Sequence, residues 1–214
     1  MNKLFVFASF ILASCASGAA LVPEAEKGAV IFVMKDEGNW TANVTASRAD
    51  SENQRFVLDQ NGISMYIGKA PLVWAQPSAR ASSAQGGRIV ANFQLVPPGE
   101  YVFVSIYDDE SKAAGCFSSH SKLFDVQAGA ATIVALPDGE NYKKAGRSGW
   151  KFSPNVTDSE LLQLYEDDFA NIFGLELPGR VSDTISVSFE PGDHWSALAC
   201  LAPKDAHFQR IEPK

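Results

Sequence analysis

Cys116 and His120 are the residues whose types and spacing come closest to a chemical site. A cysteine and a histidine four positions apart can begin a zinc site or form a thiolate–imidazole pair that attacks a substrate. A zinc site needs four ligands, and no second pair follows at ligand spacing, because His194 and His207 stand alone. We therefore predict no catalytic residue, metal ligand or cofactor here. Cys116 is then either a disulfide partner or a buried thiol.

Two acidic runs, Asp108–Glu110 and Glu166–Asp168, are the second candidate for chemistry. Paired carboxylates can hydrolyse glycosidic bonds or bind calcium. Consecutive acids on a strand point in different directions, however, and on a helix only residues three or four apart share a face. The runs are therefore typical of solvated charge. An envelope hydrolase that uses these acidic residues or His120 is the alternative.

The rest of the sequence argues against several function classes. It contains no Gly-x-Ser-x-Gly elbow, phosphate loop, His-Glu-x-x-His motif or dinucleotide fingerprint. The formal net charge is −7, with the acids scattered. This argues against a nucleic-acid partner, because phosphate binding needs clustered Lys and Arg. The tryptophans are spread widely and are typical of a core and its rim: Trp40, Trp74, Trp150 and Trp195.

Short β-strands must position these residues. Residues 29–136 contain eight or nine strand patterns and no helix pattern. In the clearest pair, Arg88–Val96 and Glu100–Tyr107 alternate with a period of two on either side of Pro-Pro-Gly, which predicts a turn or short arch. Strands at this spacing predict a mainly β protein, an antiparallel β-sandwich of the immunoglobulin or prealbumin type.

Two connections within the predicted sandwich have their own signals. Asn61 and Gly62 both accept positive φ, so they predict a hairpin between Arg55–Gln60 and Ile63–Lys69. The stretch Asp108–Gly115 is polar or small and is predicted to be a loop.

The pattern changes after residue 137. Thr157 and Glu160 form a capping box, and the apolar residues behind them repeat every 3.6 positions. This predicts one amphipathic helix, Asp158–Phe173, ended by Gly174. We expect residues 138–214 to form an α+β extension that packs on the sandwich of residues 28–137.

The N-terminus carries the strongest functional signal. The positive segment Met1–Lys3 precedes the apolar run Leu4–Leu12, which is too short to span a bilayer. The run ends in Leu-Ala-Ser before Cys15 and resembles the bacterial lipobox. The resemblance implies a lipoprotein signal peptide at 1–15, acylation of Cys15 and a tether at 16–27. Because Ala16 is not Asp, it also implies the outer membrane in enteric-type sorting.

The alternative is an ordinary signal peptide cut between residues 16 and 20, which would give a soluble periplasmic or secreted binding domain. Either way, the mature chain is expected outside the cytoplasm. If Cys15 is acylated, Cys116 and Cys200 remain, and such a pair can bond in an oxidising compartment. Two separate buried thiols are the other reading, because sequence does not show whether the Cα atoms come within reach.

Residues 92–136 resemble the closing strands of prealbumin-like and carboxypeptidase-regulatory-like β-sandwiches, and an uncharacterised domain of bacterial lipoproteins. The similarity lies in the turns Pro98–Tyr101 and Val126–Gly129, each of which leads towards a strand. It implies a sandwich topology and a lipoprotein context, and it carries over no activity.

These features together predict a lipid-anchored cell-envelope protein. It would act as a non-enzymatic binding or structural module that contacts an envelope protein or polymer. Its membrane contact would be the N-terminal lipid anchor.

Overall fold

The computed structural model describes residues 26–36, 41–57, 62–68, 78–83, 87–108, 113–138, 140–141, 152–190, 200 and 207–212. Up to residue 136, the described chain forms β1 Gly28–Lys35, β2 Thr41–Asp50, β3 Arg55–Val57, β4 Ile63–Gly68, β5 Ala79–Ser82, β6 Arg88–Val96, β7 Gly99–Asp108, β8 Ala113–Cys116, β9 Ser121–Val126 and β10 Ala131–Ala135. After it come β11 Glu140–Asn141, α1 Asp158–Leu164, the π-helical η2 Tyr165–Phe169, α2 Ala170–Phe173, β12 Gly179–Val181, β13 Ile185–Phe189 and β14 Phe208–Arg210.

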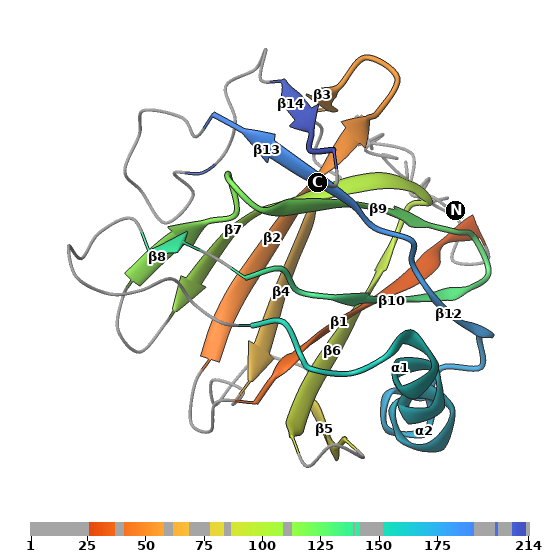
Figure 1. Ribbon diagram of the computed structural model, residues 1–214. Helices are drawn as coiled ribbons and strands as arrows, with labels where there is room; N and C mark the ends of the chain where they lie inside the picture. Colours follow the sequence, from red (N-terminus) through yellow and green to blue (C-terminus); the bar gives the residue numbers. More distant parts are fainter. Residues whose placement is uncertain are drawn as a thin grey trace, which may run out of the picture.

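The strands form two packed sheets (Figure 1). The first has the order β12-β10-β1-β6-β5, and the second has the order β11-β8-β7-β9-β13-β14. In the second sheet β7 also pairs with β2, which carries β3 and β4 along its other edge. Most pairs are antiparallel, whereas β1 with β10 and β10 with β12 are parallel. The predicted β-sandwich with one helix near the C-terminus is confirmed.

The two sheets approach each other along both sides, so the sandwich is close to a barrel. On one side, Asn92 Nδ2 of β6 donates to Tyr66 O of β4 over 2.6 Å, and the Ser64 N–H donates to Gln94 Oε1 over 3.3 Å. On the other side, the chain passes directly from β12 in the first sheet to β13 in the second. Side chains of β6 thereby satisfy part of the β4 edge, which could otherwise pair with another chain.

The Pro-Pro-Gly segment is an arch between the sheets. The strands on either side of it are confirmed as β6 and β7, but β6 belongs to the first sheet and β7 to the second. Gly99 has φ of 142°, a conformation that favours glycine. The Tyr101 hydroxyl donates to Pro97 O over 2.7 Å and fixes the arch from inside.

The predicted hairpin at Asn61 and Gly62 is wrong. In the described chain β3 and β4 both pair with β2, at Arg48↔Val57 and Ala46↔Ile63. The strand β2 has ten residues, which is long enough to hold both strands end to end. The predicted loop at residues 108–115 is also wrong in part, because β8 pairs there with β7. Its alanines and glycine give no alternating pattern.

Three apolar clusters stack through the molecule. The largest lies between the sheets, where the Phe103 ring packs on Phe32 and Phe124 with centroids 4.8 and 4.9 Å away. The second lies between the first sheet and the helix. The third covers the opposite face of the second sheet, because Val102 and Val104 alternate with Phe103 along β7. The first sheet is therefore covered by the helix on its outer face, and the second sheet is covered on its outer face around β7, β9 and β13.

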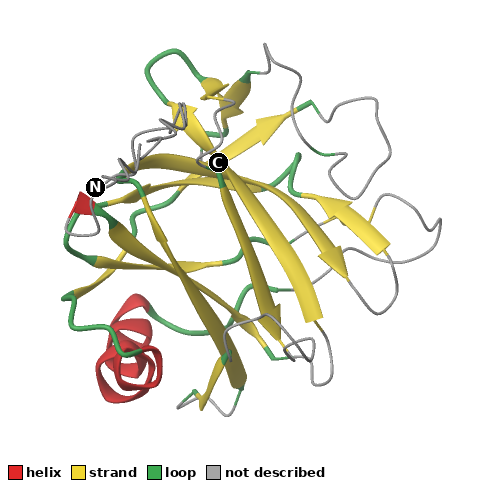
Figure 2. Ribbon diagram, turned by 180° about the vertical axis from the view of Figure 1, so that it is seen from behind, coloured by secondary structure: helices red, strands yellow, loops and turns green. Residues whose placement is uncertain are grey.

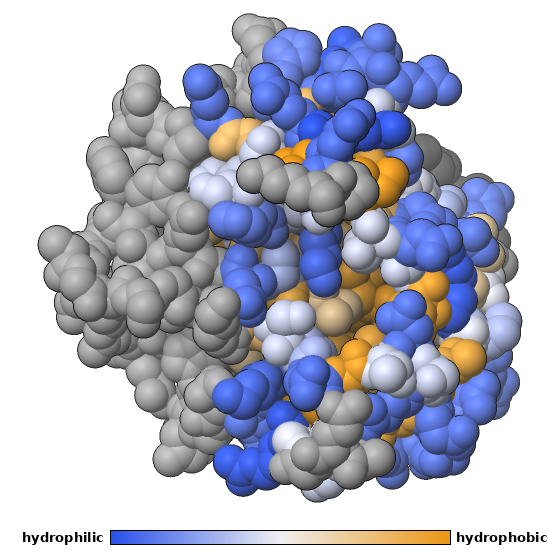
Figure 3. Space-filling view, viewed as in Figure 1, coloured by the Kyte–Doolittle hydropathy of each residue, from blue (hydrophilic) through white to orange (hydrophobic). Residues whose placement is uncertain are grey.

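The helix begins and ends where the sequence predicts. Thr157 Oγ1 accepts the Glu160 N–H over 3.3 Å, and Gly174 ends the helix with φ of 65°. Figure 2 shows the helix on the outside of the strands, at one side of the molecule. Apolar residues reach the surface around β10, β12 and the start of the helix (Figure 3).

The middle of the helix is π-helical, which the sequence did not indicate. Tyr165 begins this turn, is buried, and donates its hydroxyl to Leu177 O over 2.6 Å. Its ring lies against Gly179 of β12, where a Cβ atom would overlap the ring. A glycine at this position therefore lets the helix approach the first sheet.

Candidate functional site

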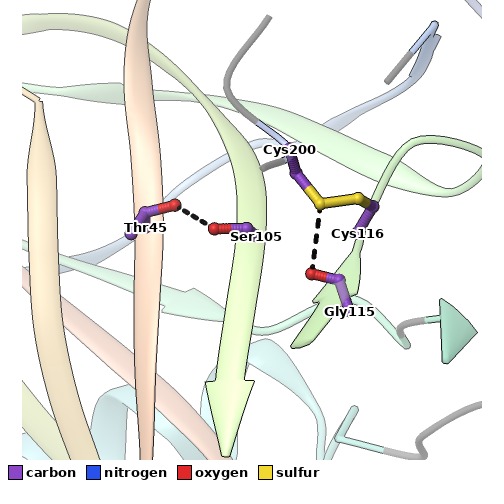
Figure 4. Close-up of a disulfide and its surroundings, with 5 residues drawn as sticks. All are labelled: Thr45, Ser105, Gly115, Cys116 and Cys200. Carbon is purple, nitrogen blue, oxygen red and sulfur yellow. Dashed lines mark hydrogen bonds between the residues drawn. A yellow bond between two sulfur atoms is a disulfide. The ribbon is translucent and has the colours of Figure 1, made fainter. Parts of the chain in front are cut away.

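A disulfide joins Cys116 at the end of β8 to Cys200, between β13 and β14. The two Cα atoms are 5.6 Å apart, and the cysteines are separated by 84 positions in the sequence. Figure 4 shows the bridge beside Gly115, whose carbonyl oxygen lies 3.5 Å from Cys200 Sγ. Nearby, the hydroxyls of Thr45 and Ser105 are 2.7 Å apart and link β2 to β7. The bridge thus attaches the segment after β13 to the second sheet.

The disulfide belongs to the third apolar cluster. Both cysteines are only 4% exposed. The Phe56 ring packs on Phe189 and Phe208 with centroids 5.3 and 5.5 Å away. A backbone bridge between Arg55 and His207 joins β3 to β14 over the same cluster. The surroundings are those of a packed core, which points to a structural role for the bridge.

The bond changes what the Cys116–His120 spacing can do. A bonded cysteine cannot supply the thiolate that a zinc site or a nucleophile requires. His120 is exposed in the turn after β8, and its backbone N–H donates to Phe117 O over 3.1 Å. Within the described ranges, no group of three His, Cys, Asp or Glu residues could hold a metal ion.

Several sequence candidates lie outside the described residues: Cys15, Asp109, Glu110, His194 and the four tryptophans. Asp108 is the last residue of β7. The acids Glu166–Asp168 are exposed on the helix, where water solvates them. Of the sequence candidates that the structure describes, it brings together Cys116 and Cys200.

Lys122 has a chemically unusual environment that the sequence did not reveal. Its Nζ donates to Ala135 O over 3.4 Å and so links β9 to β10. Burial lowers the pKa of Lys122, while the charges of Asp138 and Asp158 act in the opposite direction. An amine with a lowered pKa can act as a base, but this one holds two strands together. In an alternating strand, nothing distinguishes it from a solvent-facing lysine.

Asp125 and Arg180 form a bidentate ion pair that ties β9 of the second sheet to β12 of the first. Nη1 lies 2.9 Å from Oδ2, and Nη2 lies 3.2 Å from Oδ1. Ser182 Oγ donates to Oδ1 over 3.2 Å. Burial acts to raise the pKa of Asp125, but the hydrogen bonds and charge of Arg180, helped by Ser182 and Gln127, outweigh it and lower the pKa.

This pair predicts a pH dependence of stability. Because the folded-state pKa of Asp125 is lowered, the pair stabilises the fold above the ordinary aspartate pKa of about 3.9 and loses that effect as the pH falls through the folded value. In Asp125→Asn, the loss of unfolding free energy relative to wild type should therefore be larger at pH 7 than at pH 3. Urea titrations at both pH values measure it. Asp168→Asn, at an exposed helix position, is the control; a difference that stays constant with pH would contradict the prediction.

The chain matches no protein-family model, no curated protein and no solved structure. Among the residues that the structure describes, no helix is long and apolar enough to cross a membrane. The function must therefore be inferred from the residues and their geometry.

Proposed function

We propose that this protein is a lipid-anchored cell-envelope protein, held in the outer membrane through Cys15, that acts as a non-enzymatic binding or structural module. One observation carries the proposal. The chain has three cysteines, and the disulfide uses Cys116 and Cys200. The remaining one, Cys15, follows Leu-Ala-Ser at the end of the apolar run, which is the position of the acylated cysteine in a lipobox.

Two features of the fold support this reading. A buried disulfide fits an oxidising compartment outside the cytoplasm, where such bonds persist. Aromatic side chains, including Phe32, Phe103 and Phe124, fill the space between the sheets. We therefore place binding on the outer surface or at a rim of the sandwich.

Metabolic labelling with palmitate in a bacterial host tests the anchor. The wild-type chain should incorporate label and fractionate with membranes, because acyl chains on the mature N-terminus hold it there. Cys15→Ala should lose both the label and the membrane association. The matched control is Cys116→Ser with Cys200→Ser, which removes the other two cysteines and should keep the label.

Two outcomes would contradict the lipoprotein proposal. One is a wild-type chain that incorporates no label. The other is a Cys15→Ala chain that remains labelled, since the acyl group would then be attached elsewhere.

A further inference from the structure

A buried carboxylate holds two exposed arginines at one rim of the sandwich. Asp36 follows β1, and its side chain is 5% exposed. Arg80 Nε lies 3.5 Å and Arg88 Nε 3.8 Å from the same oxygen, Asp36 Oδ2. The two arginine side chains remain 46% and 66% exposed. The cluster therefore presents two guanidinium groups outward from one internal anchor.

The strand register explains why these three residues meet. Arg80 of β5 lies opposite Val90, and Arg88 of β6 lies opposite Ser82. The Asp36 N–H donates to Arg88 O over 2.8 Å, so the end of β1 is fixed beside the start of β6. Three neighbouring strands of the first sheet thus deliver the cluster to a single edge.

The cluster has the charge and geometry of an anion-recognition site. Two guanidinium groups against one carboxylate leave an excess positive charge, in a chain whose formal net charge is −7. A guanidinium group has five N–H donors, and its planar fork binds a carboxylate through two parallel hydrogen bonds. The contact that each arginine makes with Asp36 is through its Nε, and both arginine side chains stay exposed enough to meet a ligand.

The cluster also lies away from the predicted anchor. The strand β1 runs from Gly28, where the tether arrives, to Lys35, next to Asp36. Its eight residues span about 26 Å. In Figure 1 the red start of β1 is at the upper right, and β5 lies at the bottom of the molecule. A chain anchored at Cys15 would hold this rim on the side away from its attachment.

We propose that Arg80 and Arg88 bind carboxylate groups of the cell-wall polymer, the peptidoglycan whose peptide stems carry such groups. This inference rests on the envelope location proposed above. The cell wall carries negatively charged carboxylate groups that complement the two arginines. It also lies on the side to which the rim would point. Asp36 is a positioning residue in this site, and the two arginines are the groups that touch the ligand.

The test is co-sedimentation with purified peptidoglycan sacculi. It uses the chain from Ala16 onward, because every described element lies within residues 26–212. The main variant combines Asp36→Asn with Arg80→Gln and Arg88→Gln, so that no buried carboxylate is left without its partners. The matched control is Arg55→Gln, a side chain that is 58% exposed and pairs with Asp50. Both variants change the net charge by −1.

The triple variant should bind sacculi about tenfold more weakly than wild type or worse, because it loses charge-assisted hydrogen bonds. Arg55→Gln should bind like wild type, and amidating the carboxyl groups of the sacculi should abolish wild-type binding. A second variant, Arg80→Lys with Arg88→Lys, keeps the charge but loses the forks and should bind at an intermediate level. Equal unfolding midpoints establish that each variant is folded.

Three results would overturn the proposal: no wild-type binding, equal weakening by Arg55→Gln, or binding to amidated sacculi that matches binding to untreated ones. The co-sedimentation assay measures binding through Arg80 and Arg88, and it does not depend on the acylation of Cys15. A chain that takes up palmitate but does not bind sacculi therefore refutes the carboxylate site and leaves the lipoprotein proposal standing. A chain that binds sacculi without taking up palmitate refutes the lipoprotein proposal and leaves the carboxylate site standing.

Discussion

Replacing both Cys116 and Cys200 by alanine should lower the free energy of unfolding by about 4–5 kcal/mol. The cysteines are 84 positions apart, and a cross-link over such a distance removes much of the conformational freedom of the unfolded chain. A typical domain is stable by only about 5–15 kcal/mol. The bridge should therefore supply a large share of the stability of this fold.

Urea titration followed by tryptophan fluorescence measures the effect. The wild-type chain in a reducing agent should behave like the double variant, whereas Cys15→Ala, which leaves the bridge intact, should unfold like wild type. An unfolding midpoint in the double variant equal to that of wild type would contradict the prediction. So would two reactive thiols per chain after unfolding Cys15→Ala without a reducing agent.

The effect should also be uneven across the molecule. Cys200 is joined to the second sheet by this bond, and β13 and β14, which lie on either side of it in the sequence, pair with each other. The third apolar cluster therefore loses its disulfide cross-link in the double variant. The inter-sheet cluster keeps all of its side chains. Amide hydrogens of β13 and β14 should exchange faster than those of β1.

The helix shows which parts of the fold could be predicted from the sequence. Residues close to one another in the sequence determine its cap at Thr157, its apolar period and its end at Gly174. The strands β6 and β7 were predictable for the same reason, since alternation is a local property. Within the helix, the π-helical turn was not predicted; it begins at Tyr165, whose ring lies against Gly179 of β12.

Sheet membership was not predictable, because pairing depends on contacts between distant residues. The Asn-Gly signal favours a local reversal, yet β3 and β4 both pair with the long β2. Alternation gives the two faces of β6 and β7 but not the sheets to which they belong. For the same reason, the sequence did not predict the hydrogen bonds that side chains of β6 make to β4.

The candidate sites also divide into one that the sequence indicated and one that only the fold reveals. The sequence named Cys116 and Cys200 as possible partners but left two separate thiols as an alternative, since only the fold sets the distance between them. It gave no sign of the arginine cluster, because Asp36, Arg80 and Arg88 are brought together by three strands. Single charges on separate strands look like ordinary surface residues until the register is known.

Phe103→Ala should be the most damaging single substitution in the inter-sheet cluster, with a cost of about 3–5 kcal/mol in the free energy of unfolding. The Phe103 side chain is fully buried, and its ring packs on Phe32, Phe117 and Phe124. Removing it takes away the transfer energy of the ring and leaves a cavity that both sheets border. Chemical denaturation of the purified variant measures the loss.

Phe93→Ala is the matched comparison, because it removes the same ring from the other face of the first sheet. Phe93 is only partly buried and packs on Phe173 of the helix, with centroids 4.9 Å apart. Its loss should therefore cost about half as much as that of Phe103. If Phe93→Ala were the costlier change, the contact with the helix, and not the packing of the sheets on each other, would dominate the stability. The rim that carries Arg80 and Arg88 would then depend on the helix, because β5 and β6 belong to the sheet that the helix covers.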